Sequence, residues 1–211
     1  MMRTGTPART GLIAGLAALA LAGCVSLGGG EPPESLLTLT STAIASDGAR
    51  AGGGGGAADG EAGAGAIAVL TPEAPAKLDV LRVPVTVSAT EIAYLKDAYW
   101  VDKPARLFRR LVGETLRTRT DALVIDTDDT PTEPEVKLRG TLIDMGYDAP
   151  SRTAVVRFEA VRTSPGEGAV SRRFEAIESG IEAEAGAVGP ALNRAANRVA
   201  ADVADWIAGE S

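Results

Sequence analysis

Cys24 is the one cysteine of this 211-residue chain, which contains no histidine. Without histidine there is no imidazole general base and no imidazole ligand for a metal ion. A single cysteine also excludes an intramolecular disulfide and a thiolate cluster. Carboxylates and hydroxyls are plentiful, but no pair of them has a spacing that marks a catalytic site. The residue types therefore predict a protein that is not an enzyme, with no catalytic residue, no metal site and no cofactor.

The residues before Cys24 have the pattern of an export signal. Arg3 and Arg9 precede an unbroken apolar run over 11–22, and small residues follow this run. A basic start, an apolar run of ~7–15 residues and small residues before a cleavage site define a secretory signal. The run is too short for a membrane-spanning helix, which needs about 20 apolar residues. We therefore expect residues 1–23 to be a signal peptide.

The tetrapeptide Leu-Ala-Gly-Cys at 21–24 resembles the bacterial lipobox. The resemblance implies cleavage before Cys24 and a diacylglycerol on its sulfur, so that acyl chains anchor the mature protein to a membrane. The alternative is an ordinary signal peptide with an accidental cysteine. Residue 25 is valine and not aspartate, which by the sorting rule of enterobacteria predicts the periplasmic face of the outer membrane.

Charge limits the partners of the chain, and composition indicates which residues fold. The formal charge is −7, and without residues 1–23 the chain has 19 basic and 28 acidic residues, a charge of −9. This acidic balance argues against nucleic acid as a partner. The Gly- and Pro-rich residues 24–35 predict a flexible tether, and the Gly- and Ala-rich residues 48–66 predict a disordered loop. We expect a single domain over 36–211 that contains this loop.

Apolar spacing predicts two main helices, at about 103–118 and 187–208. Asp102 is the expected N-cap of the first helix, with Pro104 in its first turn. Pro190 is expected in the first turn of the second helix, whose apolar stripe consists largely of alanine. Both helices need a partner surface for their apolar faces.

Short alternating or β-prone runs provide that surface. The expected strands are residues 36–40, 67–70, 81–87, 92–95, 98–101, 122–125, 136–147, 154–160 and 170–177. Pro84 lacks an N–H and should lie at a sheet edge or a bulge. A change in apolar phase after Leu142 predicts a second bulge. The order of strands and helices indicates an α+β fold, with helices packed on a mostly antiparallel sheet.

Several segments together resemble the ABC-type transport auxiliary lipoprotein family, which includes the PqiC-like lipoproteins. The longest is RVPVTVSATEIAYLKDAYWVDKPARLFRRLVGETLRTR at 82–119. Supporting segments are LLTLT at 36–40, GTLIDMGYD at 140–148 and ALNRAANRVAADVADWI at 191–207. The resemblance implies an accessory of an MCE-domain protein and an ABC permease–ATPase complex, which move phospholipid or other hydrophobic molecules between two membranes.

Two other functions fit the residues. A structural envelope lipoprotein would bind another envelope partner, such as a porin, without a role in transport. A lipid carrier would need a cavity of its own, which the alanine-rich stripes neither require nor exclude.

Two groups of residues are candidates for contact with lipid or a partner. Tyr94, Tyr99 and Trp100 form an aromatic cluster that either contacts lipid or partner, or packs as core against the first helix. Arginine side chains along that helix suit anionic head groups or an acidic partner, or form a solvated face. These arginines are Arg106, Arg109, Arg110, Arg117 and Arg119.

Acidic residues gather between the first helix and the following strand. They are Asp126, Asp128, Asp129, Glu133 and Glu135. Carboxylate oxygens are the ligands of hard cations, but the spacing does not match a calcium-binding loop. We expect a solvated loop.

Overall fold

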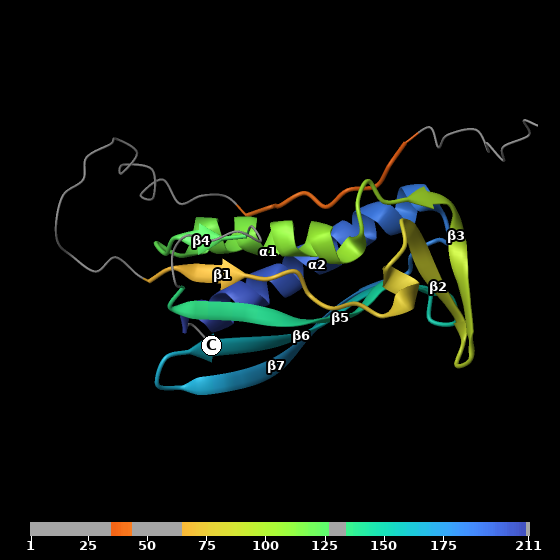
Figure 1. The fold of residues 1–211 in the computed structure, drawn as a ribbon. Coiled ribbons are helices and arrows are strands. Elements are labelled where there is room, and N and C mark those ends of the chain that lie inside the picture. The colour runs from red at the N-terminus through yellow and green to blue at the C-terminus, as the bar shows by residue number, and fades with distance from the viewer. Residues whose placement is uncertain (1–34, 44–64, 127–133, 210–211) are drawn as a thin grey trace, which may run out of the picture. The chain divides into compact units, whose positions relative to one another are not determined.

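The computed structural model describes residues 35–43, 65–126 and 134–209, all of which lie in the unit Ser35–Ser211 (Figure 1). The expected signal peptide, Cys24, the tether up to residue 34, residues 48–64 of the glycine-rich loop, and Asp128, Asp129 and Glu133 lie outside the described residues. The elements are β1 (Ile67–Val69), a 3-10 helix η1 (Ala76–Leu78), β2 (Arg82–Ser88), β3 (Glu91–Tyr99), α1 (Pro104–Arg119), β4 (Val124–Ile125), β5 (Val136–Asp148), β6 (Thr153–Ser164), β7 (Gly168–Ser179) and α2 (Ala185–Ala208).

Seven strands of the described residues form one sheet around the long strand β5. On one side β5 pairs with β6, and β6 with β7, both antiparallel. On the other side β1 and β2 run parallel to β5, β1 beside its first residues and β2 beside its last. β4 extends β1 in parallel, and β3 extends β2 antiparallel.

The predicted α+β class is confirmed, but the sheet is mixed rather than purely antiparallel. A parallel neighbour needs a long crossover connection. Here β3, α1 and β4 all lie between β2 and β5 in the chain and supply such a connection. Alternation along a strand shows which side is buried and carries no information about the direction of the neighbouring strand, so the sequence could not reveal the parallel pairs.

Both helices pack on one face of the sheet, as Figure 1 shows. Phe108 of α1 meets Phe158 of β6 edge-on, with ring centroids 5.1 Å apart. Trp206 of α2 packs against Phe174 of β7, with centroids 5.7 Å apart. Phe158 and Phe174 are register partners, so the two helices cover the same side. Burial of each of these aromatic side chains contributes about 1.5–3 kcal/mol to folding.

Three local irregularities shape the strands. The pairing of β5 with β6 skips Ile143, which confirms the predicted bulge after Leu142. Pro84 lies at a register shift between β2 and β3, where a missing N–H is tolerated. The two short strands predicted on either side of Asp97 are a single strand, β3, in which Asp97 has a left-handed φ of 54°.

The starts of the helices differ from the prediction. Lys103, not Asp102, is the N-cap of α1, and its φ of −55° and ψ of 136° are not helical. Proline disfavours helical geometry in the residue before it, so Pro104 fixes this boundary. Asp102 Oδ1 accepts a hydrogen bond from the backbone N–H of Lys103 at 2.8 Å. Helix α2 begins two residues earlier than expected, which places Pro190 in its second turn rather than its first.

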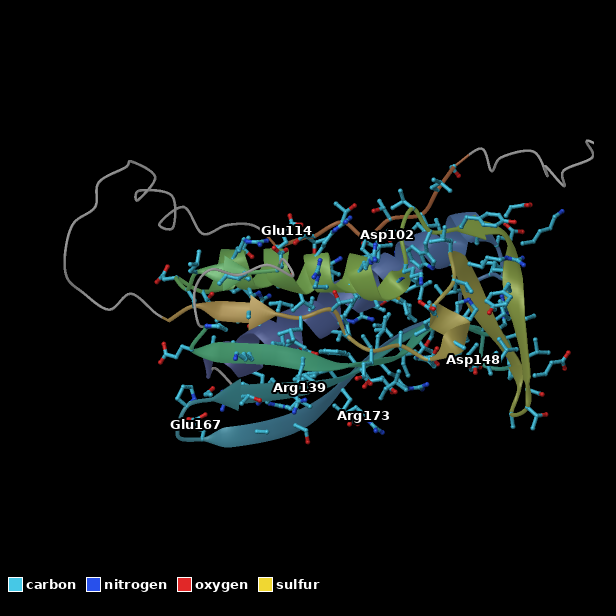
Figure 2. All side chains as sticks on the ribbon, in the orientation of Figure 1. Asp102, Glu114, Arg139, Asp148, Glu167 and Arg173 are labelled. Atoms are coloured by element: carbon cyan, nitrogen blue, oxygen red, sulfur yellow. The ribbon has the colours of Figure 1, made fainter. Side chains whose placement is uncertain are left out.

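The opposite face of β5, β6 and β7 carries charges of both signs. Arg139 of β5 and Arg173 of β7 are labelled on it in Figure 2. Arg173 forms an ion pair with Glu159 at 2.8 Å, and Arg157 forms one with Glu175. Because positive and negative side chains are interleaved across the strands, this face presents no large area of one charge to a ligand.

Glu178 joins β7 to α2 through two arginines. Its carboxylate is 16% exposed, accepts a hydrogen bond from Arg194 Nε at 2.8 Å and forms an ion pair with Arg198. The hydrogen bond from Arg194, and then Arg198, hold the pKa of Glu178 below its usual value of 4.5.

We expect Glu178→Gln to make the free energy of unfolding depend less steeply on pH under acidic conditions. A lowered pKa in the folded state means that the unfolded chain binds more protons, so this stabilisation is complete above the usual pKa and is lost as the pH falls through the folded pKa. Urea unfolding between pH 3 and pH 6 should show a shallower rise in the free energy of unfolding for Glu178→Gln than for the wild type. An unchanged slope would contradict this assignment. Glu182→Gln, an exposed change nearby, serves as control.

Candidate contact surface beside the entry segment

Residues 35–43, here called the entry segment, bring the chain from the expected tether into the domain. Leu37 lies beside the end of β3: its N–H donates to the carbonyl of Tyr99 at 2.7 Å, and its carbonyl accepts from the N–H of Val101 at 2.9 Å. A Cβ on Gly189 of α2 would lie 2.6 Å from Leu37 Cδ2. Glycine at that position therefore lets the segment approach the helix closely.

Two asparagines of α2 bind the rest of the entry segment, which runs along the helices in Figure 1. Asn193 Oδ1 accepts from the N–H of Thr40 at 2.9 Å. Asn197 Oδ1 accepts from the N–H of Thr42 at 2.8 Å, and its Nδ2 donates to the carbonyl of Thr40 at 2.9 Å. Because the two asparagines are four residues apart, they share one helix face and match alternate residues of an extended chain.

Asn197→Ala is expected to release the entry segment while the helices and sheet remain folded. The change removes every hydrogen bond between Asn197 and residues 40–42, and each such bond contributes about 0.5–1.5 kcal/mol. Hydrogen exchange followed by mass spectrometry should show faster exchange in peptides that cover 36–43. The exposed Asp202→Ala change on the same helix is the control, and equal protection in both variants would contradict the assignment.

The aromatic cluster predicted at 94–100 divides into two parts. Trp100 is 1% exposed and belongs to the core, and its Nε1 has no hydrogen-bond partner among the described residues. Tyr94 and Tyr99 are half-buried and flank the guanidinium of Arg82, whose Cζ lies 5.1 and 5.7 Å from their ring centroids. Guanidinium groups stack favourably on aromatic faces. Arg82 was not a sequence-based candidate, because only the register of β2 with β3 brings it opposite Tyr99.

The arginines predicted on α1 do not form one surface. Arg106 and Arg110 are exposed and share Asp102, labelled in Figure 2, at 3.9 and 3.5 Å. Arg109 is half-buried beside the apolar side chains between α1 and the sheet. Farther along the helix, Arg117 pairs with Asp126, and Arg119 pairs with Asp205 of α2. The beginning of α1 thus keeps two exposed arginines beside Asp102.

The family model for an ABC-type transport auxiliary lipoprotein component matches residues 52–204. The chain belongs to this family. The match extends from before β1 almost to the end of α2 and includes β3, α1 and the two asparagines. The family described by the sequence resemblance is confirmed. No curated protein matches the chain by sequence.

Two solved structures share the fold of this auxiliary lipoprotein. A Xanthomonas campestris protein of the DUF330 family is 17% identical, with a TM-score of 0.60, and the alignment covers 68% of this chain and 83% of that protein. An uncharacterised protein is 14% identical, with a TM-score of 0.59, and the alignment covers 67% of this chain and 91% of that one. At these identities the likeness concerns the fold alone.

Among the described residues, a small apolar hollow lies beside α1. This hollow, between α1 and the sheet, has about 200 Å³ of space, including space open to solvent. Small-molecule pockets have roughly 300–1,000 Å³. Within the described ranges, no three acidic side chains gather as metal ligands would, and neither helix is apolar over a length that could cross a bilayer.

Proposed function

We propose that this auxiliary lipoprotein is anchored to the outer membrane through Cys24 and serves, from the periplasm, an MCE-type intermembrane lipid transport system. The observation that carries the proposal is the family match over 52–204. An auxiliary component positions or connects the transport machinery, so we propose a role without catalysis. The partners are the MCE-domain protein and the ABC permease–ATPase complex, and the cargo class is phospholipid or a similar hydrophobic molecule.

The mechanism we propose is positional. The lipid on Cys24 holds the protein at the membrane, residues 24–34 give it reach, and the folded domain docks on the MCE partner. The entry segment supports this mechanism, because any force on the tether passes first to residues 36–43. Hydrogen bonds from Leu37 to β3 and from Thr40 and Thr42 to α2 transmit that force to the core. The domain is thereby held at a fixed point rather than by a frayed end.

Capture of the protein from its own cells tests the proposal. The full-length lipoprotein, tagged at its C-terminus and crosslinked before extraction, should recover the MCE-domain protein and the permease. An unrelated outer-membrane lipoprotein with the same tag controls for proximity at the membrane. Recovery of neither protein, in a strain that makes both, overturns the transport role. Recovery of a porin or a cell-wall element instead identifies the structural envelope lipoprotein.

A further inference from the structure

Three exposed aliphatic side chains lie where the entry segment meets β2 and β3. Leu36, Leu81 and Val101 are 51%, 46% and 52% exposed. Backbone hydrogen bonds connect the segments that carry them. Leu37, which follows Leu36, bonds to Tyr99 and Val101. The carbonyl of Leu81 accepts a hydrogen bond from the N–H of Trp100 at 2.9 Å. We call these three side chains the anchor-end patch. Contiguous exposed apolar surface marks contact sites, and the backbones of these three residues are neighbours through these hydrogen bonds.

Amphipathic and basic residues border the anchor-end patch. The backbone N–H of Leu37 bonds to Tyr99, and the ring of Tyr99 packs on Arg82, so an aromatic–guanidinium stack lies beside the patch. After Val101 come Lys103, which pairs with Asp79, and two arginines, Arg106 and Arg110, which share Asp102 and are 61% and 63% exposed. Tyrosine rings and arginine stems suit the head-group region of a bilayer, and basic groups suit its phosphates.

The length of the chain before Ser35 limits how far the patch can be from the lipid. Residues 24–34 number eleven, and a fully extended chain spans at most ~3.3–3.6 Å per residue, so they reach no farther than about 40 Å. Leu36 is thus among the first residues after the anchor. A tethered surface meets its target at a high effective concentration, so a small patch is sufficient for contact.

We propose that the anchor-end patch rests on the surface of the phospholipid bilayer that holds the Cys24 lipid. Leu36, Leu81 and Val101 enter the head-group region, and the basic side chains at the start of α1 contact lipid phosphates. The contact fixes the orientation of the domain, with the entry segment toward the membrane. This inference rests on the lipidation of Cys24 in the proposed function.

Depth-dependent quenching tests the contact on the full lipidated protein. Because the lipid occupies the sulfur of Cys24, a thiol introduced by Val101→Cys is the only free one and takes a bimane label. The matched control is Ser171→Cys, an exposed position on β7. Both proteins are placed in vesicles of phosphatidylethanolamine and phosphatidylglycerol that contain a lipid with a head-group nitroxide. We expect at least twofold stronger quenching at position 101 than at position 171.

The outcomes separate the contact from the anchor. Equal quenching at both positions, on protein whose Cys24 lipid is verified by mass spectrometry, overturns the membrane contact alone. Absence of the lipid from Cys24 overturns the contact and the proposed anchor together. A label at 101 that shifts to shorter wavelength as protein density rises, without quenching by the nitroxide lipid, overturns the membrane contact in favour of a second copy of the chain.

A polar variant gives a second readout. Leu36→Ser combined with Leu81→Ser removes two patch side chains that are about half exposed, so the thermal unfolding of the domain should change little. With the label at position 101, this variant should lose at least half of the quenching. Unchanged quenching in the folded variant overturns the assignment of these side chains.

Discussion

Cys24→Ser is expected to abolish acylation of the protein, and with it the lipid anchor. A serine hydroxyl is not the thiol on which the diacylglycerol would be carried, so the variant has no acyl chain. Each CH₂ of a buried acyl chain contributes about 0.8 kcal/mol to membrane binding, and stable anchoring takes two acyl chains. Radiolabelled palmitate should be incorporated into the wild type and be at background in the variant. The variant should appear as the unlipidated form in the soluble fraction or keep its uncleaved signal.

The matched control for this experiment is Ser26→Ala, which leaves the tetrapeptide at 21–24 unchanged. It should incorporate the label as the wild type does. Palmitate incorporation that persists in Cys24→Ser would refute lipidation at this residue. It would also return the first 23 residues to the alternative of an ordinary signal peptide.

The helices were predictable from the sequence because their periodicity depends on one face only. Leu107, Phe108, Leu111 and Leu116 have the spacing of a single stripe, and all four are buried. A stripe on a helix is buried whichever partner covers it, so its recognition needs no knowledge of the tertiary structure. The same reasoning identified the phase change of β5, since a bulge shifts the buried set by one residue.

Neither the parallel strand pairs nor the hydrogen bonds between α2 and the entry segment could be predicted in this way. β1 and β4 are short strands whose direction is decided by their pairing with each other and with β5. Asn193 and Asn197 are polar residues on an alanine-rich helix, which is a visible signal. Their partners, however, lie more than 150 residues earlier in the chain.

The aromatic cluster held information that the sequence analysis left unused. Neighbouring residues of a strand point to opposite faces. Tyr99 and Trp100 are adjacent, so they could not both have belonged to one contact patch if both lay in a strand. The structure separates them in this way, with Trp100 in the core and Tyr99 half-buried against Arg82. The proposed membrane contact consequently depends on the aliphatic side chains of the anchor-end patch, which no pattern in the sequence distinguished.

Gly140→Ala is expected to destabilise the domain by about 3 kcal/mol, at the upper end of what overpacking usually costs. A Cβ at position 140 of β5 would lie 2.8 Å from the ring of Phe158 and closer still to the carbonyl oxygen of Glu159. A backbone carbonyl cannot move aside as a flexible side chain can. Displacement of Phe158 also disturbs its packing on Phe108, so the cost extends from the sheet to α1.

The matched control is Gly186→Ala in the first turn of α2. Apart from its chain neighbours and the backbone of its own helix, no described atom lies within 4 Å of the Cβ that it would add. Alanine is more favourable than glycine within a helix by roughly 0.5–1 kcal/mol, so this variant should be as stable as the wild type or more stable. Urea unfolding followed by circular dichroism measures both. A Gly140→Ala variant within about 0.5 kcal/mol of the wild type would place β5 and β6 farther apart than described, because surface substitutions alone stay within that range.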